Sequence, residues 1–456
     1  MSDETTSQRE FGYLEANKLY AVNCKKAPSC DKKCSQLHFF GRKTISLHSN
    51  ANSSSSYMEQ ILRNEYLSQL NTWRDKQVIK VITGVRRSGK STLLAQFQNI
   101  IIASGVKNEQ IQSINFEDLA NEHLSDYKVL YKHITDRLLP NSQNYIFLDE
   151  IQMVNNYQRV VDSLLLRPNV DIYITGSNAY LLSSEIATLL SGRYIEIRIL
   201  PLSFAEYKST SVIPMEDTYR KYISETSFPY GLQLPNRDAV REYLQGLYST
   251  VILKDIVQRR KLQDMDLLER IIRFLCDNIG SPTSVRNITN NLQAGGRKVS
   301  DHTVENYLQS LVECYLFFRV EHYDVRGKQR LKVGHKYYIT DLGLRNLLIG
   351  IHGNDLGHML ENTVYLELFR RGYQVMVGKM TSTEVDFVTI KSGNFAYYQV
   401  SLSVRDSKTL QRELAPLLQI NDHYPKYLLT LDNDPVVIHQ GIKQIYALDW
   451  LLSTGE

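Results

Sequence analysis

The sequence is poor in the features that mark several protein classes. It has five cysteines and two tryptophans among 456 residues, so a disulfide framework cannot organise the chain, and a reduced compartment is expected. No apolar run approaches the roughly 20 residues that a membrane-spanning helix requires. Charge of neither sign dominates, since 53 Lys and Arg face 49 Asp and Glu, so any nucleic-acid-binding surface would have to be local. We therefore expect a cytoplasmic globular protein.

The length and a hydrophobic content of 43% favour several packed domains. Residues 1–57 differ from the rest, because they lack a sustained helical or strand period and end in a run of serines. Three cysteines lie there beside two histidines, but their spacing lacks the close pairs of common zinc sites; they are Cys24, Cys30, Cys34, His38 and His48. We predict a disordered extension, with a new helical pattern starting at Met58.

A buried strand is predicted at residues 78–83, because they are short, β-branched and bounded by Gly84. The next residues match the pattern G-x-x-x-x-G-K-[ST] and lead into a helix, which is the strand–loop–helix context of a phosphate-binding loop. Backbone N–H groups of such a loop wrap phosphates, while Lys90 reaches the β- and γ-phosphates and Ser91 can ligate Mg²⁺. The residues expected around the nucleotide are Gly84, Val85, Arg86, Arg87, Ser88, Gly89, Lys90, Ser91 and Thr92.

A second buried strand, at residues 145–150, ends in two carboxylates about sixty positions later. Asp149 is suited to hold the hydration shell of Mg²⁺, and Glu150 is suited to take a proton from the attacking water or to orient it. Apolar runs that end in Asp-Glu are common, but this one becomes evidence for nucleotide hydrolysis because it accompanies the phosphate-binding loop.

A further strand is expected at residues 170–175, followed by Gly176, Ser177 and Asn178. Strands that alternate with helices predict a parallel sheet covered on both faces, with ligand at its carboxyl edge. Polar groups after this strand should lie between the other two motifs and can contact the γ-phosphate, although an ordinary turn fits equally well. Arg193 is a candidate to stabilise phosphoryl charge in its own or a neighbouring subunit, with a surface ion pair as the alternative.

These motifs, together with N-F-E-D at 115–118, I-F-L-D-E-I-Q at 146–152, and L-S-G-R-Y and L-P-L-S-F-A-E-Y within 190–207, resemble a large prokaryotic family. Its members are predicted AAA-type ATPases with a C-terminal domain of unknown function, and the similarity runs from about Met58 to the end. The resemblance implies an ASCE-type sheet with Glu150 as catalytic glutamate. It also implies that Asn178 or Ser177 acts as a sensor and that Arg193 is a sensor or arginine finger.

The middle of the chain has the pattern of a winged helix. Three helical stretches, at 267–279, 285–292 and 303–311, precede two strands at 315–320 and 336–339 that flank a polar turn. In DNA-binding members of this architecture the third helix enters the major groove. Its solvent face here carries no Lys or Arg, but Asp301, His302, Glu305, Asn306 and Gln309.

Basic residues lie beside this helix instead, and they can hold a nucleic-acid backbone without reading its sequence. They are Arg297 and Lys298 before the helix, with Arg326, Lys328, Arg330, Lys332 and Lys336 along the predicted wing. The alternative is a winged helix that serves as a lid or a protein-contact module, with a solvated basic turn. Charge alone does not decide between the two.

The last segment resembles a PD-(D/E)xK nuclease with a degraded site. Glu361 on a helix and Asp386 on a strand match the pattern, but the E-x-K element reads Gln399-Val400-Ser401. Amide for carboxylate removes a hard metal ligand, and serine for lysine removes the positive charge beside the water. We therefore predict the fold without cleavage, although Lys379 or Lys391 can in principle substitute from elsewhere.

The expected fold is α/β: a P-loop parallel sheet of AAA/ASCE type, a winged-helix domain and a restriction-endonuclease-like C-terminal domain. The predicted segments are 1–57 extension, 58–210 ATPase, 211–265 helical lid or linker, 266–340 winged helix and 341–456 nuclease-like domain. The expected function is Mg²⁺-dependent ATP hydrolysis coupled to conformational change that acts on DNA or RNA. The alternative is an ATP-dependent protein-interaction switch, and a homo-oligomer is compatible with either.

Overall fold

The computed structural model describes residues 61–176, 192–251, 256, 264–380 and 383–453. The predicted extension, with its cysteines and histidines, lies outside these residues. Residues 59–456 cluster as one compact unit. Within the described ranges, no helix combines the length and the apolar composition needed to cross a membrane.

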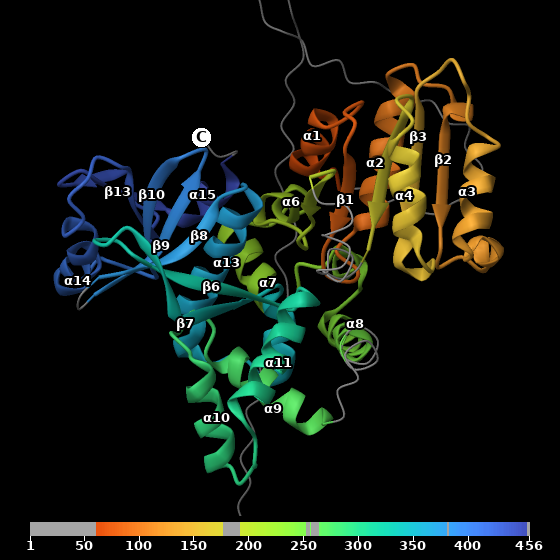
Figure 1. The fold of residues 1–456 in the computed structure, drawn as a ribbon. Coiled ribbons are helices and arrows are strands. Elements are labelled where there is room, and N and C mark those ends of the chain that lie inside the picture. Colours follow the sequence, from red (N-terminus) through yellow and green to blue (C-terminus); the bar gives the residue numbers. More distant parts are fainter. Residues whose placement is uncertain (1–60, 177–191, 252–255, 257–263, 381–382, 454–456) are drawn as a thin grey trace, which may run out of the picture. The chain divides into compact units, whose positions relative to one another are not determined.

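The first sheet contains five parallel strands in the order β2-β3-β4-β1-β5 (Figure 1). Their bounds are β1 (Ile79–Thr83), β2 (Ile111–Asn115), β3 (Asn144–Asp149), β4 (Val170–Thr175) and β5 (Tyr194–Arg198). Strand β4 therefore separates the strand that carries the phosphate-binding loop from the strand that ends in Asp149. The parallel sheet and the central place of the third predicted strand are both confirmed.

Helices cover both faces of this sheet, because alternate residues of each strand point to opposite sides. On one face, α1 (Asn64–Thr72) and α2 (Lys90–Ala103) pack on Ile82, Phe147 and Tyr173, the last two with stacked rings 4.7 Å apart. On the other face, α3 (Tyr127–Thr135) and α4 (Tyr157–Leu165) pack on Ile146 and Leu148. Short 3₁₀ turns at Asn108–Gln110, Leu119–Leu124 and Ile151–Met153 complete the connections.

The segment predicted as a lid is helical. It contains α6 (Phe204–Ser209), α7 (Met215–Ser224), a 3₁₀ turn at Pro229–Gln233 and α8 (Arg237–Thr250). Helix α6 begins at a capping box, in which Ser203 Oγ accepts from Glu206 N and the Glu206 carboxylate accepts from Ser203 N. The turn after α7 is fixed by Asp341, whose buried carboxylate accepts from Ser227 N at 2.7 Å.

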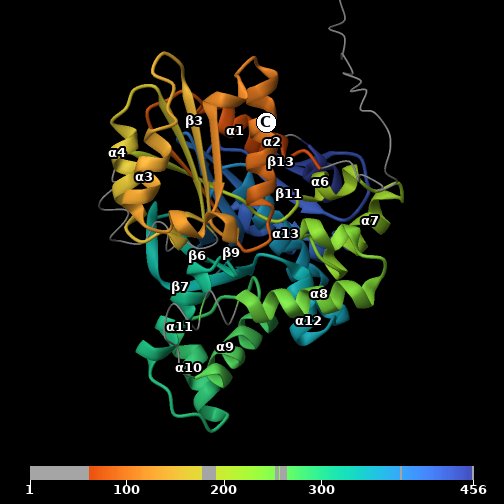
Figure 2. The same ribbon diagram turned by 90° about the vertical axis from the view of Figure 1, so that its right-hand side faces the viewer.

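Three helices and a hairpin follow, in the predicted order. They are α9 (Met265–Asp277), α10 (Val285–Ala294), α11 (Asp301–Glu313), β6 (Phe317–Asp324) and β7 (Gln329–Ile339). Asp264, Ser284 and Ser300 cap the three helices with their side chains. The helices lie side by side in both ribbon views (Figures 1 and 2), and Thr283 and His335 form an isolated antiparallel bridge.

The hairpin is not a separate wing but the edge of a second, eight-stranded sheet of order β12-β13-β11-β10-β9-β8-β6-β7. Strand β6 pairs with β7 on one side and parallel with β8 on the other. The remaining strands are β8 (Gln374–Lys379), β9 (Glu384–Lys391), β10 (Asn394–Ser401), β11 (Lys426–Thr430), β12 (Val437–His439) and β13 (Ile442–Tyr446). The pairing of β6 with β8 was not predicted, because the sequence analysis expects only a two-stranded wing, in which β6 has a single partner.

Helices cover both faces of the second sheet as well. Helices α13 (Leu356–Arg370) and α15 (Ala447–Leu452) pack on one face, in the same core cluster as Phe387 and Tyr398. Helix α14 (Ser407–Leu418) packs on the other, against Val388 and Leu428. Helix α12 (Leu342–Ile349) and a 3₁₀ turn at Gly353–Asp355 connect β7 to α13.

Candidate functional site

The loop after β1 has the backbone that a phosphate-binding loop requires. Gly84 has φ +142°, and a Cβ there would lie 2.2 Å from the Ile199 carbonyl oxygen, so any other residue would collide with β5's continuation. Arg87 and Gly89 also have positive φ, at +67° and +98°, which turns the chain around the start of α2. The pattern G-x-x-x-x-G-K-[ST] thus folds as a concave turn at a helix amino terminus.

The polar side chains of this loop fit a nucleotide. Lys90 is buried at the first position of α2, with Nζ 3.1 Å from the Gly84 carbonyl oxygen and 3.9 Å from Glu150 Oε1. The Ser88 hydroxyl is buried and has no hydrogen-bond partner among the described residues. The Ser91 hydroxyl hydrogen-bonds the carboxylate of Asp149, so the two groups predicted to share Mg²⁺ lie together.

Asp149 and Glu150 stand at the carboxyl end of β3, next to the loop. Burial raises the pKa of Asp149, and hydrogen bonds from Thr175 and Ser91 oppose that rise. Glu150 has φ +54°, its backbone N–H donates to Thr175 Oγ1 at 3.0 Å, and the Gln152 amide donates to its carboxylate. The side chain is thereby held beside Lys90 rather than turned to solvent.

Thr175 is a site residue that the sequence analysis missed. It ends β4, its hydroxyl donates to the Asp149 carboxylate, and it accepts from Glu150 N. The polar residues predicted to lie between the two motifs, Ser177 and Asn178, come after the strand and lie outside the described residues. The signal was available, because the last residue of a strand between two such motifs must meet both.

Arg193 lies at the other edge of the sheet. Its carbonyl oxygen accepts from Ile79 N at the start of β1, whereas the phosphate-binding loop follows the end of that strand. Its guanidinium pairs with Asp162, and both side chains are about half exposed. The structure therefore does not bring Arg193 to the loop of its own subunit, and only a contact with a neighbouring subunit remains open for it.

The loop also contacts the N-F-E-D segment. Arg86 pairs with Glu117 at 2.7 Å, and Phe116 N donates to the Asp149 carbonyl oxygen at 3.1 Å. That segment follows β2, whose end lies beside the end of β3 in the sheet. Four strand ends, those of β1, β2, β3 and β4, thus contribute to one polar edge.

Arg63 holds the back of the phosphate-binding loop and was not predicted. It is buried, donates to the Ser88 carbonyl oxygen at 3.1 Å and to the Leu200 carbonyl oxygen at 2.8 Å, and pairs with Glu206 at 2.8 Å. Its Nη2 also lies 3.5 Å from the Pro201 carbonyl oxygen, which accepts from Arg370 of α13 at 3.0 Å. Two arginines therefore meet on the L-P-L-S-F segment.

Comparisons with known proteins find an AAA domain over the residues that form this site. Residues 76–208 match the family described as an AAA domain, and residues 216–355 match a domain of unknown function. An uncharacterized protein of Haemophilus influenzae is 39% identical over 399 residues, which span 86% of this chain and 98% of that protein. The chain belongs to the same family. An uncharacterized protein of Methanocaldococcus jannaschii is 32% identical over 68% of this chain and 71% of its own length.

Solved structures also resemble part of this chain. A Walker-type ATPase of Pyrococcus abyssi covers 63% of this chain and 95% of its own, at 15% identity and a TM-score of 0.44. The AMPPCP-bound DnaA from Aquifex aeolicus covers 55% and 89%, at 15% identity and a TM-score of 0.29. At these scores the likeness carries no argument about function.

Beyond its AAA domain, this family member brings together the acidic residues that resemble a nuclease site. Glu361 and Asp386 both lie within 3.8 Å of one ammonium nitrogen, Lys336 Nζ. The sequence analysis predicts that this lysine, on β7, belongs to a basic surface. It is instead almost completely buried, and three carboxylates surround it. Neither lysine named as a substitute reaches this place by any described contact: Lys379 is exposed, and Lys391 Nζ donates to the Arg371 carbonyl oxygen.

Gln399 is near this cluster but its amide is already used. Its Oε1 accepts from Asp386 N at 3.3 Å, and its Nε2 donates to Glu413 at 2.9 Å. The Ser401 hydroxyl donates to the Ser403 carbonyl oxygen at 3.3 Å. The strand position that carries a carboxylate and a lysine in an active nuclease of this type therefore holds two neutral side chains, with hydrogen bonds directed elsewhere.

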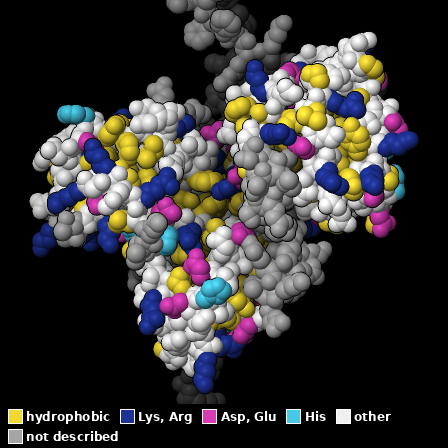
Figure 3. Space-filling view, viewed as in Figure 1, with side chains coloured by type: hydrophobic (Ala, Val, Ile, Leu, Met, Phe, Trp, Pro, Cys, Tyr) yellow, Lys and Arg dark blue, Asp and Glu magenta, His cyan; other side chains and the backbone are white. Residues whose placement is uncertain are grey.

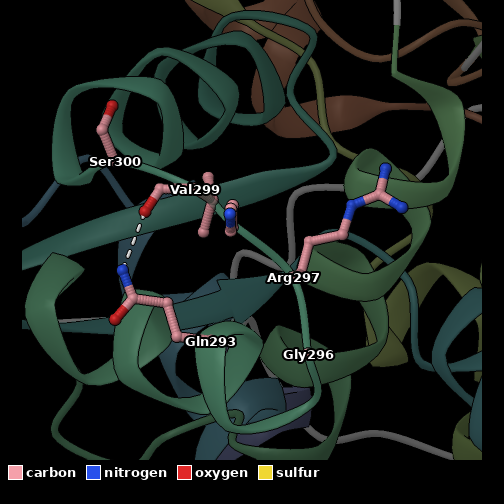
Figure 4. Close-up of a pocket in the computed structure, with 6 residues that line it drawn as sticks. Gln293, Gly296, Arg297, Val299 and Ser300 are labelled. Atoms are coloured by element: carbon pink, nitrogen blue, oxygen red, sulfur yellow. Dashed lines mark hydrogen bonds between the residues drawn. The ribbon is translucent and has the colours of Figure 1, made fainter.

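The basic residues near α11 differ in how they are engaged. Arg297 pairs with Asp266 at 2.9 Å and with Asp264, and Figure 4 shows its side chain turned away from the pocket that it lines with Gln293 and Ser300. Arg330 lies 3.7 Å from Glu321. The other basic positions, which are exposed, are Lys298, Arg326 and Lys328; Lys332 is in β7, but its side chain lies outside what the structure describes.

On the face shown in Figure 3, the described residues form no large patch of a single charge. Figure 3 shows Lys and Arg side chains scattered over several elements and mixed with acidic and apolar ones. On the exposed face of α11, two acidic side chains are paired with arginines from neighbouring elements: Glu305 with Arg319 at 2.6 Å and Asp301 with Arg286 at 3.4 Å. Any contact with nucleic acid would rest on the few lysines of the neighbouring loop and hairpin turn.

Proposed function

We propose that the AAA domain binds ATP with Mg²⁺ and hydrolyses it, and that hydrolysis is coupled to movement of the segments after β5. The observation that carries this proposal is the convergence of Lys90, Asp149, Glu150 and Thr175 on one edge of the sheet, beside a loop that only glycine at position 84 allows. If the sequence formed only a Gly-rich turn with a surface lysine, Lys90 would be exposed, and Asp149, Glu150 and Thr175 would not lie beside it.

Each residue has a role that its surroundings support. Backbone N–H groups from Gly84 to Thr92 would bind the phosphates, and Lys90 would exchange its loop carbonyls for phosphate oxygens. Ser91 and Asp149 would hold Mg²⁺, which when bound neutralises phosphate charge. Glu150 would take the proton of the attacking water, because its carboxylate is held in place by the Gln152 amide. Asn178 as a sensor and Arg193 as a finger for a neighbouring subunit belong to the same proposal.

The contacts behind the loop support coupling. The Thr83 hydroxyl, at the end of β1, donates to Glu196 at 2.6 Å, and the same carboxylate oxygen accepts from Tyr315 OH at 3.2 Å. On the other side, Arg63 joins the Ser88 carbonyl oxygen to the Pro201 region that Arg370 also contacts. A displacement of the loop by phosphates would therefore be transmitted by hydrogen bonds to the helices and sheet after residue 200.

We further propose that the target is DNA or RNA, held through its phosphates by the α10–α11 loop and the hairpin turn. Three helices with a bridge to a hairpin suit a winged helix, and Lys298 and Lys328 are the exposed lysines beside it. Contacts of this kind position a backbone and carry no sequence information. The nuclease-like tail would serve as a second binding surface without cleavage.

A specific observation favours the alternative, an ATP-dependent protein-interaction switch. Several of the seven basic residues counted for nucleic acid are engaged internally, among them Lys336 in a buried cluster, Arg297 with two aspartates and Arg330 with Glu321. The experiment that decides is ATP turnover by the full chain with and without DNA, at two salt concentrations, for the parent and for Lys298→Glu with Lys328→Glu. Lys107→Glu, an exposed lysine of the AAA domain, is the matched charge control.

If phosphates are contacted, DNA stimulates turnover, the stimulation fades steeply with salt, and the paired substitution removes it while the control does not. Each lost phosphate contact should reduce the slope of log affinity against log salt by about 0.9. Turnover that is indifferent to DNA at low salt would reject DNA as the target, and indifference to RNA in the same assay as well would leave the protein switch. Absence of turnover under all conditions would reject hydrolysis itself.

A further inference from the structure

The buried cluster of the second sheet is built around a lysine. Lys336 Nζ lies 3.0 Å from Glu361 Oε1, 2.6 Å from Glu384 Oε1 and 3.8 Å from Asp386 Oδ1. The three acids come from different elements, Glu361 from α13 and the other two from β9, where positions 384 and 386 share one face of the strand. The lysine comes from β7, at the edge of the sheet, and only 3% of its surface is exposed.

Further groups tie these acids down. Tyr338 OH donates to Glu361 Oε1 at 2.7 Å, and Val400 N donates to Asp386 Oδ2 at 2.8 Å. Two histidines border the cluster, His322 with Nε2 3.5 Å from Glu384 Oε2 and His358 with Nδ1 3.7 Å from Glu361 Oε2. Carboxylates from a helix and a strand that converge on one centre are the arrangement in which a protein holds a hard divalent cation. Here the centre is an ammonium group.

The protonation pattern agrees with a fixed cation. Burial alone would lower the pKa of Lys336, but the attraction of Glu361, Asp386 and Glu384 raises it above its ordinary value. Burial, and then repulsion from Glu361, raises the pKa of Asp386 well above its ordinary value. For Glu361, burial is outweighed by Lys336, His358 and Tyr338, so its pKa is lowered. The lysine therefore keeps its charge, and the carboxylates adjust to it.

A divalent ion does not fit beside that lysine. The acid oxygens that would ligate it are already within hydrogen-bond or ion-pair distance of Nζ, so a divalent ion would have to displace the ammonium group from them. Over the described residues, no group of three or more His, Cys, Asp or Glu side chains has a geometry that could hold a metal ion. Gln399, at the position where a third hard ligand is expected, is bonded to Glu413 and to Asp386 N.

We infer that Lys336 is a built-in cation that occupies the place of the divalent metal in this nuclease-like site, so the C-terminal sheet holds its carboxylates without any metal. The ammonium joins β7 to α13 and β9, which is the structural role that a metal plays between the same kinds of element. The inference concerns the C-terminal sheet and stands whether or not the AAA domain hydrolyses ATP. It also predicts that removal of the ammonium group opens a cation site.

The test measures Mn²⁺ uptake by the full chain without nucleotide, from the loss of the free Mn²⁺ signal in electron paramagnetic resonance. The melting temperature of each protein is measured with and without Mn²⁺. Four proteins are compared: the parent, Lys336→Met, Lys336→Met with Asp386→Asn, and the charge-retaining control Lys336→Arg. We expect Lys336→Met to melt lower than the parent in EDTA, and to bind one more Mn²⁺ per chain with recovery of its melting temperature. The double variant and Lys336→Arg should show neither gain.

A folded Lys336→Met that takes up no additional Mn²⁺ would overturn the inference. Because that variant can fail to fold, Asp386→Asn alone is measured against the parent. Equal Mn²⁺ uptake by those two supports a cluster that is closed to metal, since ions bound at the phosphate-binding loop are unaffected by position 386. Mn²⁺ that binds the parent and is lost in Asp386→Asn would show a working metal site beside the lysine, and would refute the replacement.

Discussion

Glu150→Gln separates the two tasks of the proposed ATPase site. The change keeps the length of the side chain and an oxygen that can accept from the Gln152 amide, which in the parent donates to the Glu150 carboxylate. It also keeps the hydrogen bond from the backbone N–H of position 150 to Thr175 Oγ1, at 3.0 Å. What it removes is the basicity of a group that would act on water and not on phosphate.

The expected magnitude follows from that loss. A positioned general base contributes about 10²–10⁴ in rate, which is about 2.7–5.4 kcal/mol of barrier at 1.36 kcal/mol per tenfold. Lys90 Nζ lies 3.9 Å from Glu150 Oε1 and both side chains are largely buried, so the carboxylate competes with phosphate for the ammonium group. Since the variant lacks that competing attraction, its affinity for ATP should be unchanged or tighter than that of the parent.

The assay is nucleotide affinity at equilibrium together with single-turnover hydrolysis. Glu117→Gln is the matched control, because it is the same substitution on a Glu that pairs with Arg86 of the loop but is half exposed. Such pairs contribute about 0–1 kcal/mol, so hydrolysis by the control should stay within about fivefold of the parent. Hydrolysis by Glu150→Gln at the parental rate would refute the assignment, and the chain would then be a nucleotide-binding switch or use another base.

Five further outcomes are expected. Lys90→Ala should weaken nucleotide binding and hydrolysis together, whereas Asp149→Asn should impair the Mg²⁺-dependent part of binding, both read by titration with and without Mg²⁺. Thr175→Val should lower the single-turnover rate with less effect on nucleotide affinity, because the hydroxyl orients both the Asp149 carboxylate and the backbone of Glu150. A variant as active as the parent would show that Thr175 is not part of the site. A chain that begins at Met58 should fold and turn over ATP like the full chain, as measured by melting and turnover; precipitation would contradict a dispensable extension. With Mg²⁺ or Mn²⁺ the protein should not cleave linear, supercoiled or single-stranded DNA, and cleavage abolished by Asp386→Ala would show a working nuclease.

The nucleotide site was predictable because its residues are consecutive or follow a strand. The loop from Gly84 to Thr92 and the pair Asp149-Glu150 need only the rule that parallel strands end at one edge. Thr175 was missed although the predicted strand ends at the right residue, because a polar contact was expected only from the residues after the strand. Arg193 precedes its strand and so lies at the amino edge, where it forms the surface ion pair that was the alternative expectation; its role toward a neighbouring subunit stays a proposal.

The second site was only half predictable. Glu361 and Asp386 follow a pattern with local spacing, but Lys336 comes from a strand that joins this sheet through a parallel pairing of β6 with β8. No local period reveals which distant strands pair, since registers are decided by packing of whole faces. The same limit hid Arg63 and Arg370, which approach one carbonyl oxygen from opposite ends of the chain.

The Pro201 carbonyl oxygen between those two arginines has a consequence for how the protein can be divided. A fragment that stops near residue 210 would lose Arg370 and would uncover Val85, Leu200 and Leu202, which belong to the core cluster that also contains Leu368. Expression of the AAA segment alone should then give an insoluble or misfolded product. Likewise, a chimaera with the C-terminal half of a distant relative should be soluble only if Arg63, Glu206 and Arg370 come as a matched set.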